Sequence, residues 1–154
     1  METQRASAPA HLPDDLRLLL SREHARLDRL FRELLAAFEA DARVDVARLW
    51  NEFDADLRAH MQLEEDELMP KFLEFNALDA VDLLRDHQRI RDKLLALGVG
   101  VDLHQTRHTQ VAEFLRELRA HARREDELMY RWAEQCLEGE PRQSLLQYLL
   151  AKLH

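Results

Sequence analysis

The stretch LRAHMQLEEDELM at residues 57–69 returns as LRAHARREDELM at residues 118–129. A second pair, REHARL at 22–27 and RDHQRI at 85–90, repeats in the same way. Each copy holds one histidine, and the matched histidines lie 61 positions apart (60 to 121) and 63 apart (24 to 87). Within each half the two histidines are 36 positions (24 to 60) and 34 positions (87 to 121) apart. The sequence therefore indicates two related helix hairpins with one histidine on each helix.

Apolar residues recur through these repeats at the spacing of amphipathic helices. The expected helices cover residues 13–41, 45–70, 79–98, 109–138 and 142–153. Pro70 is expected to kink or stop the second helix, since it lacks an amide donor. Asp79 is the expected N-cap of the third helix, Gly98 and Gly100 are expected to end it, and VGVDLHQTRH at 99–108 is expected to be a loop. This pattern predicts an all-α fold, an up-down-up-down four-helix bundle with a short C-terminal fifth helix.

Composition supports this class and excludes others. The 154 residues are 46% hydrophobic and 34% charged, with only three glycines and four prolines, which favours helices over a turn-rich β fold. The net charge of −8 argues against nucleic acid as a partner. The sequence has no run of about 18 apolar residues, so no membrane span is expected. Cys136 is the single cysteine, so no internal disulfide can form, and a cytoplasmic location is expected.

The expected organisation has three parts. Residues 1–12 are a loose N-terminal leader, residues 13–138 form the bundle, and residues 139–154 form the C-terminal helix that packs on it. A homodimer is an open alternative to a monomer.

The histidines fall at matching levels of the expected bundle. His24 lies 17 residues before Asp41 and His60 lies 15 after Asp45, so both sit roughly 25 Å from the loop that they share. The same reasoning from Pro70, Asp79, Gly98 and Gln110 places all four repeat histidines in one layer. The expected layer consists of His24, His60, His87 and His121.

A glutamate follows two of these histidines by four positions, Glu64 after His60 and Glu125 after His121. Residues at i and i+4 share one helix face, so both side chains of each pair can reach a metal near the bundle axis. Imidazole and carboxylate together suit iron, zinc or manganese, and carboxylates can bridge two such ions. Four histidines and two glutamates supply three protein ligands per ion and leave an open position.

Several neighbouring groups have plainer interpretations. A single H-xxx-E is weak evidence, because 30 of the 154 residues are acidic and such pairs often lie on solvated faces. Asp126 and Glu65, each five positions after a histidine, are expected at the surface, whereas Glu67 shares a face with His60 and could accept a hydrogen bond from a ligand. An Asp28–Arg91 pair over the site is an alternative to two unrelated solvent positions.

The remaining notable side chains are expected outside the site. His104 and His108 have H-xxx-H spacing but fall in the expected loop, and Tyr130, nine positions after His121, is expected to point away from the metal face. Cys136 is expected to be inert. The tail histidines, His11 and His154, are assigned no role. The methionines and tryptophans are assigned to core packing: Met61, Met69, Met129, Trp50 and Trp132.

These motifs, taken together, resemble the hemerythrin-like (HHE cation-binding) family over about residues 14–137. The resemblance rests on one ordered set of residues: His24, His60 with Glu64 and ELMP at 67–70, His87, and His121 with Glu125. It does not extend to ferritin-like bundles, whose signature is Glu-x-x-His.

The resemblance implies a non-haem centre of two iron ions, bridged by Glu64, Glu125 and an oxo or hydroxo group, with zinc as a substitute metal. The oxygen-carrying members of the family have a second histidine where this chain has Arg91. They use an aspartate at the position of Asp126, whereas this chain also has Glu125 beside it. Four histidines with two glutamates are similar to the branch linked to nitric-oxide or oxidative-stress response.

The function expected from this resemblance is binding of, or reaction with, a small oxidant (O2, NO or H2O2), with a reductant that the sequence does not identify. As an enzyme it would be a peroxidase, a catalase-like protein or an NO-reducing oxidoreductase. An iron store, donor or sensor, a reversible O2 carrier, and a metal-free interaction bundle are the alternatives.

Overall fold

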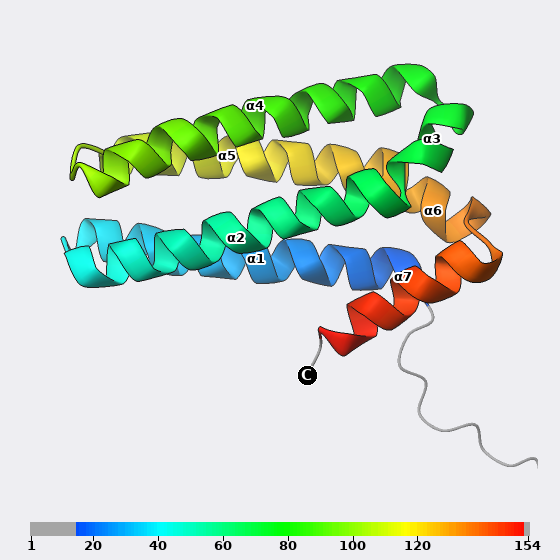
Figure 1. Ribbon diagram of the computed structural model, residues 1–154, viewed down its shortest axis with the longest axis horizontal. Helices are drawn as coiled ribbons and strands as arrows, with labels where there is room; N and C mark the ends of the chain where they lie inside the picture. Colours follow the sequence, from blue (N-terminus) through cyan, green and yellow to red (C-terminus); the bar gives the residue numbers. More distant parts are fainter. Residues whose placement is uncertain (1–14, 153–154) are drawn as a thin grey trace, which may run out of the picture.

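Two antiparallel helix hairpins lie side by side in the computed structural model, which describes residues 15–152 (Figure 1). One hairpin consists of α1 (Leu16–Glu39) and α2 (Arg43–Glu67), and the other of α4 (Ala77–Asp102) and α5 (His108–Glu125). Both hairpin turns lie at the same end of the bundle. The described part of the chain contains no strand, so the prediction of an all-α bundle is confirmed.

Short helices close the other end of the bundle (Figure 1). They are α3 (Met69–Phe75), the π-helical turn η1 (Asp126–Tyr130), α6 (Arg131–Cys136) and α7 (Gly139–Ala151). The helix α7, expected at 142–153, begins three residues earlier and crosses obliquely beside the start of α1. The expected leader, His11 and His154 lie outside the described residues.

The expected limits of the first two helices are close to those observed. Asp15 caps α1 by accepting a hydrogen bond from the Leu18 amide, and a turn with Asp41 at φ 51° joins α1 to α2. Pro70 acts as predicted, because α2 ends at Glu67 and the proline occupies the first turn of α3, where it needs no amide partner.

The limits of α4 correct two expectations. Its N-cap is Asn76 and not Asp79, because the Asn76 side chain accepts a hydrogen bond from the Asp79 amide. Gly98 and Gly100 do not end the helix, which continues to Asp102, so that only residues 103–107 form the loop.

Both glycines instead allow close approach of neighbouring side chains. A Cβ at Gly98 would lie 3.1 Å from Nε1 of Trp50, and a Cβ at Gly100 would lie 2.1 Å from Oγ1 of Thr106. The turn itself is made at His104, whose φ is 55°.

Two apolar clusters fill the bundle, one toward the hairpin turns and one at the closed end. Phe31, Phe53 and Phe114 pack edge to face in the first cluster, and Phe72 contacts Trp132 in the second. The methionines and tryptophans assigned to the core are buried, as predicted. Between the clusters lies a layer of buried polar side chains: Glu23, His60, Glu64, Asp86, His87, His121 and Glu125. Within residues 15–152, no helix is both long enough and apolar enough to cross a membrane.

Candidate metal centre

The six side chains that the sequence selected lie together, five of them in the polar layer and the less buried His24 beside it. His24, His60, His87 and His121 come from α1, α2, α4 and α5, one from each long helix. The rings meet in pairs within each hairpin, with centroids 4.9 Å apart for His24 and His60 and 5.0 Å apart for His87 and His121. The predicted layer of four histidines is therefore present, and its role as a ligand set stays a prediction.

Glu125 lies between the two histidine pairs. Its Oε1 is 3.1 Å from Nε2 of His24 and 3.1 Å from Nε2 of His121. Its Oε2 is 3.2 Å from Nε2 of His87. One carboxylate thus spans both hairpins.

Glu64 is placed differently, because only its Oε1 faces the histidines. That oxygen lies 3.2 Å from Nε2 of His60 and 3.5 Å from Nε2 of His87. Two groups of ligand atoms result, each compact enough for one ion: His24, His60, Glu64 and Glu125 in one, and His87, His121 and Glu125 in the other.

The buried carboxylates of the layer favour positive charge on the groups around them. Burial lowers the pKa of His87, but its hydrogen bond to Glu125 and the negative charges of Glu125 and Glu64 raise that pKa overall to about 9. The pKa values of His60 and His121 are also raised, against the effect of burial, by the same carboxylates. The pKa of Glu125 is far below its usual range because three histidines face it and outweigh its burial. Protons or metal ions can supply this charge.

The unpaired atoms favour metal ions. Within the described residues, Oε1 of Glu64 and Nε2 of His121 are buried without a hydrogen-bond partner, although each lies close to an oppositely charged neighbour. A buried polar atom without a partner costs roughly 1–3 kcal/mol. Both atoms are ligand types for iron and zinc, and they face the interior of the cluster, so a cation there would satisfy them. The residues present fit a metal centre.

Asp86 supports this centre and was missed in the sequence. Its Oδ2 accepts a hydrogen bond from Nδ1 of His121 at 2.8 Å, and Arg89 and Arg124 pair with the same carboxylate. A carboxylate on Nδ1 fixes the tautomer that leaves Nε2 free to bind a metal. The available signal was the repeat itself, since Asp86 precedes His87 as Glu23 precedes His24.

Glu23 is buried like Asp86 but has different partners. Arg26 and Lys152 of the C-terminal segment donate to it, whereas Nδ1 of His60 has no hydrogen-bond partner. The carboxylate still contributes to the raised pKa of His60. The two halves of the repeat therefore support their histidines unequally.

Tyr130 corrects the sequence prediction most clearly. It was expected to point away from the metal face, because nine residues of an α-helix turn through about 900°, which places it opposite His121. The π-helical turn from Asp126 to Tyr130 adds about one residue to that turn and rotates the side chain back toward the cluster.

The Tyr130 hydroxyl contacts three members of the site. It donates to Oε2 of Glu64 at 2.7 Å and lies 2.9 Å from Nε2 of His24 and 3.2 Å from Nε2 of His60. Burial and the neighbouring carboxylates raise the pKa of this phenol well above its usual range, so it is neutral when no cation is bound.

Asp28 and Arg91 do not pair with each other, so of the two interpretations that the sequence offered, the unrelated positions hold. Asp28 on α1 pairs with Arg119 on α5, and Arg91 on α4 pairs with Glu65 on α2. The reason is that α1 packs against α2 and α5, whereas α4 lies diagonally across the bundle from it. Glu65 is half-buried, with Oε2 3.7 Å from Nδ1 of His87, and so lies nearer the cluster than expected.

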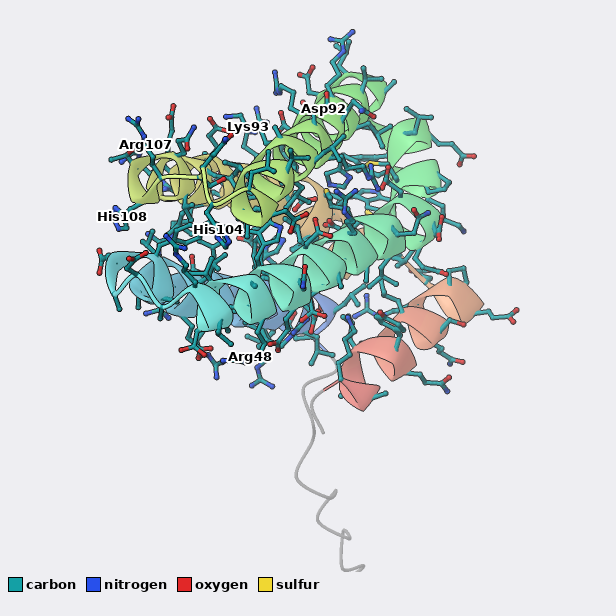
Figure 2. The ribbon with its side chains drawn as sticks, turned by 60° about the vertical axis from the view of Figure 1, so that its left-hand side comes forward. Arg48, Asp92, Lys93, His104, Arg107 and His108 are labelled. Atoms are coloured by element: carbon teal, nitrogen blue, oxygen red, sulfur yellow. The ribbon has the colours of Figure 1, made fainter. Side chains whose placement is uncertain are left out.

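Asp126, His104 and His108 lie outside the ligand groups, as expected, and so does Glu67, which was a candidate acceptor for a ligand. Asp126 accepts from Arg17 and Ser21, which, with the Arg17 charge, lower its pKa. Glu67 makes no hydrogen bond or ion pair with the cluster in the described part of the chain. Figure 2 shows His104 and His108 at the end of the bundle where α4 joins α5, and His108 there pairs with Glu39 at 2.8 Å.

A cavity of about 60 Å³ adjoins the cluster. Apolar side chains dominate its walls, and Asp28 and Arg119 line it where α1 meets α5. Its lining includes Leu27, Phe31, Phe53, Leu57, Met61, Ile90 and Leu115, together with His24, His60, Glu64, His121 and Glu125. His24 is 16% exposed and is the most accessible of the four histidines.

A four-helix bundle with buried histidines and carboxylates at its axis defines a class of metal-binding helical proteins. The chain belongs to the family of the hemerythrin HHE cation-binding domain, whose sequence model matches residues 16–133. Members of this family bind metal ions, typically iron. No curated protein and no solved structure matches the chain at a significant level.

Proposed function

We propose that the protein holds two iron ions in this cluster and that the pair binds or reacts with a small oxidant, O2, NO or H2O2. The observation that carries the proposal is the position of Glu125, whose two oxygens face different histidine pairs at 3.1–3.2 Å. A carboxylate so placed can bridge two ions. A single ion would leave one histidine pair without a partner.

Each ion has its own set of protein ligands. His24 and His60 with Glu64 serve one ion, His87 and His121 serve the other, and Glu125 serves both. All four histidines present Nε2 to the carboxylates, so a single tautomeric arrangement suits the whole site. Fewer than six protein donors on each ion leave positions for an exogenous ligand.

The cavity sets the size of that ligand. A volume of about 60 Å³ with mostly apolar walls admits a diatomic molecule or a peroxide and excludes a large organic substrate. Iron supplies the redox chemistry when it is bound. The chain's own residues position it, line the adjoining cavity with mostly apolar side chains, and direct the four imidazoles at the carboxylates.

A role as an iron-dependent sensor is the second candidate, favoured by where the site lies. The ligands join both hairpins between two separate apolar clusters, so removal of metal would loosen the contact between the hairpins. Sensor and enzyme share the site and differ only in turnover.

The test begins with protein loaded anaerobically with ferrous iron and mixed in turn with NO, O2 and H2O2. We expect a change in the absorption spectrum with at least one of these, and repeated consumption under a reductant if the protein is an enzyme. His108→Ala, far from the cluster, should behave as wild type, whereas His60→Ala should not respond. An iron-loaded wild type that responds to none of the three would contradict the proposal.

A further inference from the structure

Tyr130 is a buried oxygen donor inside the cluster that the six-residue ligand set leaves without a role. It is one of only two tyrosines in the chain, and its side chain is fully buried. Its hydroxyl lies 2.7 Å from Oε2 of Glu64, 2.9 Å from Nε2 of His24 and 3.2 Å from Nε2 of His60.

The distances from Oη to the two histidine nitrogens are those expected between neighbouring ligands of one ion. Two ligands at right angles, each bonded at about 2.1 Å, lie about 3 Å from one another. The accepted members of the same group have this spacing, with 3.2 Å between His60 and Glu64 and 3.1 Å between His24 and Glu125. Tyr130 Oη thus lies beside His24 and His60 at the spacing of a further ligand.

The surrounding structure fixes the phenol in this position. The π-helical turn rotates Tyr130 toward the axis, and the ring belongs to the apolar cluster at the closed end of the bundle. One ring face stacks on His24 with centroids 5.0 Å apart. Turns of this kind are rare and are frequent at functional sites.

The hydroxyl oxygen of Tyr130 is directed at two of the proposed ligand nitrogens. Its single proton goes to Glu64, while the hydroxyl oxygen faces Nε2 of both His24 and His60. Metal-bound imidazoles present lone pairs and not protons at Nε2. An ion held by these two nitrogens would therefore lie where the phenol oxygen can reach it.

We propose that Tyr130 is a further protein ligand of the ion held by His24 and His60, bound through Oη as a phenolate. The inference rests on the proposed iron centre. On loading, the phenolic O–H bond breaks, an oxygen–metal bond forms and the proton leaves to solvent, and no electron is transferred.

The two ions then differ in their surroundings. The first has five protein donors, from His24, His60, Glu64, Glu125 and Tyr130, and the second has three, from His87, His121 and Glu125. The second ion would keep more positions for an exogenous ligand, and the cavity is lined by ligands of both groups, with His24, His60 and Glu64 from the first and His121 from the second.

The experiment compares absorption spectra of ferric protein in the wild type, Tyr130→Phe and Tyr148→Phe, with iron content measured on each sample. A phenolate bound to ferric iron gives a charge-transfer band in the visible region. We expect the band in the wild type and in Tyr148→Phe, whose tyrosine is on α7 and half-exposed, and its loss in Tyr130→Phe while iron remains bound.

Each outcome decides the question. Iron-loaded wild type without the band, or a band that survives in Tyr130→Phe, would overturn the role of Tyr130 and leave the iron centre intact. Absence of bound iron would overturn both. Should Tyr130→Phe fail to fold, Tyr148→Phe still decides, because Tyr130 is then the only tyrosine and resonance Raman scattering in the band either shows tyrosinate modes or does not.

Discussion

The two halves of the candidate centre come from one repeated sequence and yet are built differently. In the α4–α5 half, Glu125 reaches both histidine pairs and Asp86 holds Nδ1 of His121. In the α1–α2 half, Glu64 offers one oxygen to the histidines because Tyr130 donates to the other. The repeat thus places the ligands, and local departures from the repeat decide how each half can use them.

The largest effect is expected when each glutamate is removed in turn. Glu125→Ala should reduce the iron content from about two per chain to near zero, because both ions lose a ligand. Glu64→Ala should keep the ion at His87 and His121. Elemental analysis of the purified variants measures this, and Glu127→Ala, an exposed position on the same turn, is the control. Equal losses in the Glu64 and Glu125 variants would remove the distinction between the halves.

The metal-free protein should be destabilised by alkali. Because the pKa of His87 is about 9 in the folded state and near 6.5 in the unfolded state, the folded protein binds more protons between these values. The stabilisation is complete below pH 6.5 and is lost as the pH rises through 9, by up to about 3 kcal/mol. Urea unfolding of the metal-free protein measures it.

Metal should reverse this dependence, since protons and metal compete for the same nitrogens. Metal affinity is therefore expected to rise over the same range of pH. A metal-free protein whose stability stays level or increases from pH 6.5 to 9 would contradict the charge arrangement described for the cluster.

The third comparison concerns the supporting carboxylates. Asp86→Ala removes the acceptor from His121 and should weaken metal binding by about 10–100-fold. Glu23→Ala should have a smaller effect, because Glu23 pairs with Arg26 and Lys152 and does not bond Nδ1 of His60. Competition with a chelator gives both affinities. A larger effect from Glu23 would show that the metal-loaded site reorganises toward symmetry.

The smallest effects are expected from the ion pairs that join the hairpins. Arg119→Ala and Arg91→Ala each break a partly exposed pair and should cost less than about 1 kcal/mol of stability. They should differ in kinetics, because Arg119 lines the cavity and Arg91 does not. Stopped-flow mixing with NO should show a changed rate only for Arg119→Ala, and identical rates in the two variants would exclude this route of access.

The sequence predicted the fold and the meeting of the four histidines because both depend on helical period and on distance from shared loops. His24 and His60, for example, needed only a count of residues from one turn. The end of α4 was wrong because Gly98 and Gly100 serve contacts with Trp50 and Thr106, which belong to other segments.

The errors at the site arise from local geometry and also from contacts between segments that are far apart in the sequence. Tyr130 was placed on the wrong face because the prediction assumed an unbroken α-helix, whereas the chain makes a π-helical turn from Asp126 to Tyr130. The Asp28–Arg119 pair was not predicted, because the repeat does not tell which helices are neighbours and which lie diagonally across the bundle. Asp86 could have been found from its match to Glu23, but the match alone does not indicate a hydrogen bond.

The central claim is that these side chains hold two iron ions, and elemental analysis of the iron-loaded protein tests it most directly when combined with its near-ultraviolet spectrum. We predict about two irons per chain and the near-ultraviolet absorption of an oxo-bridged ferric pair. A colourless protein that stays free of metal after expression in iron-replete medium and loading in vitro would contradict it.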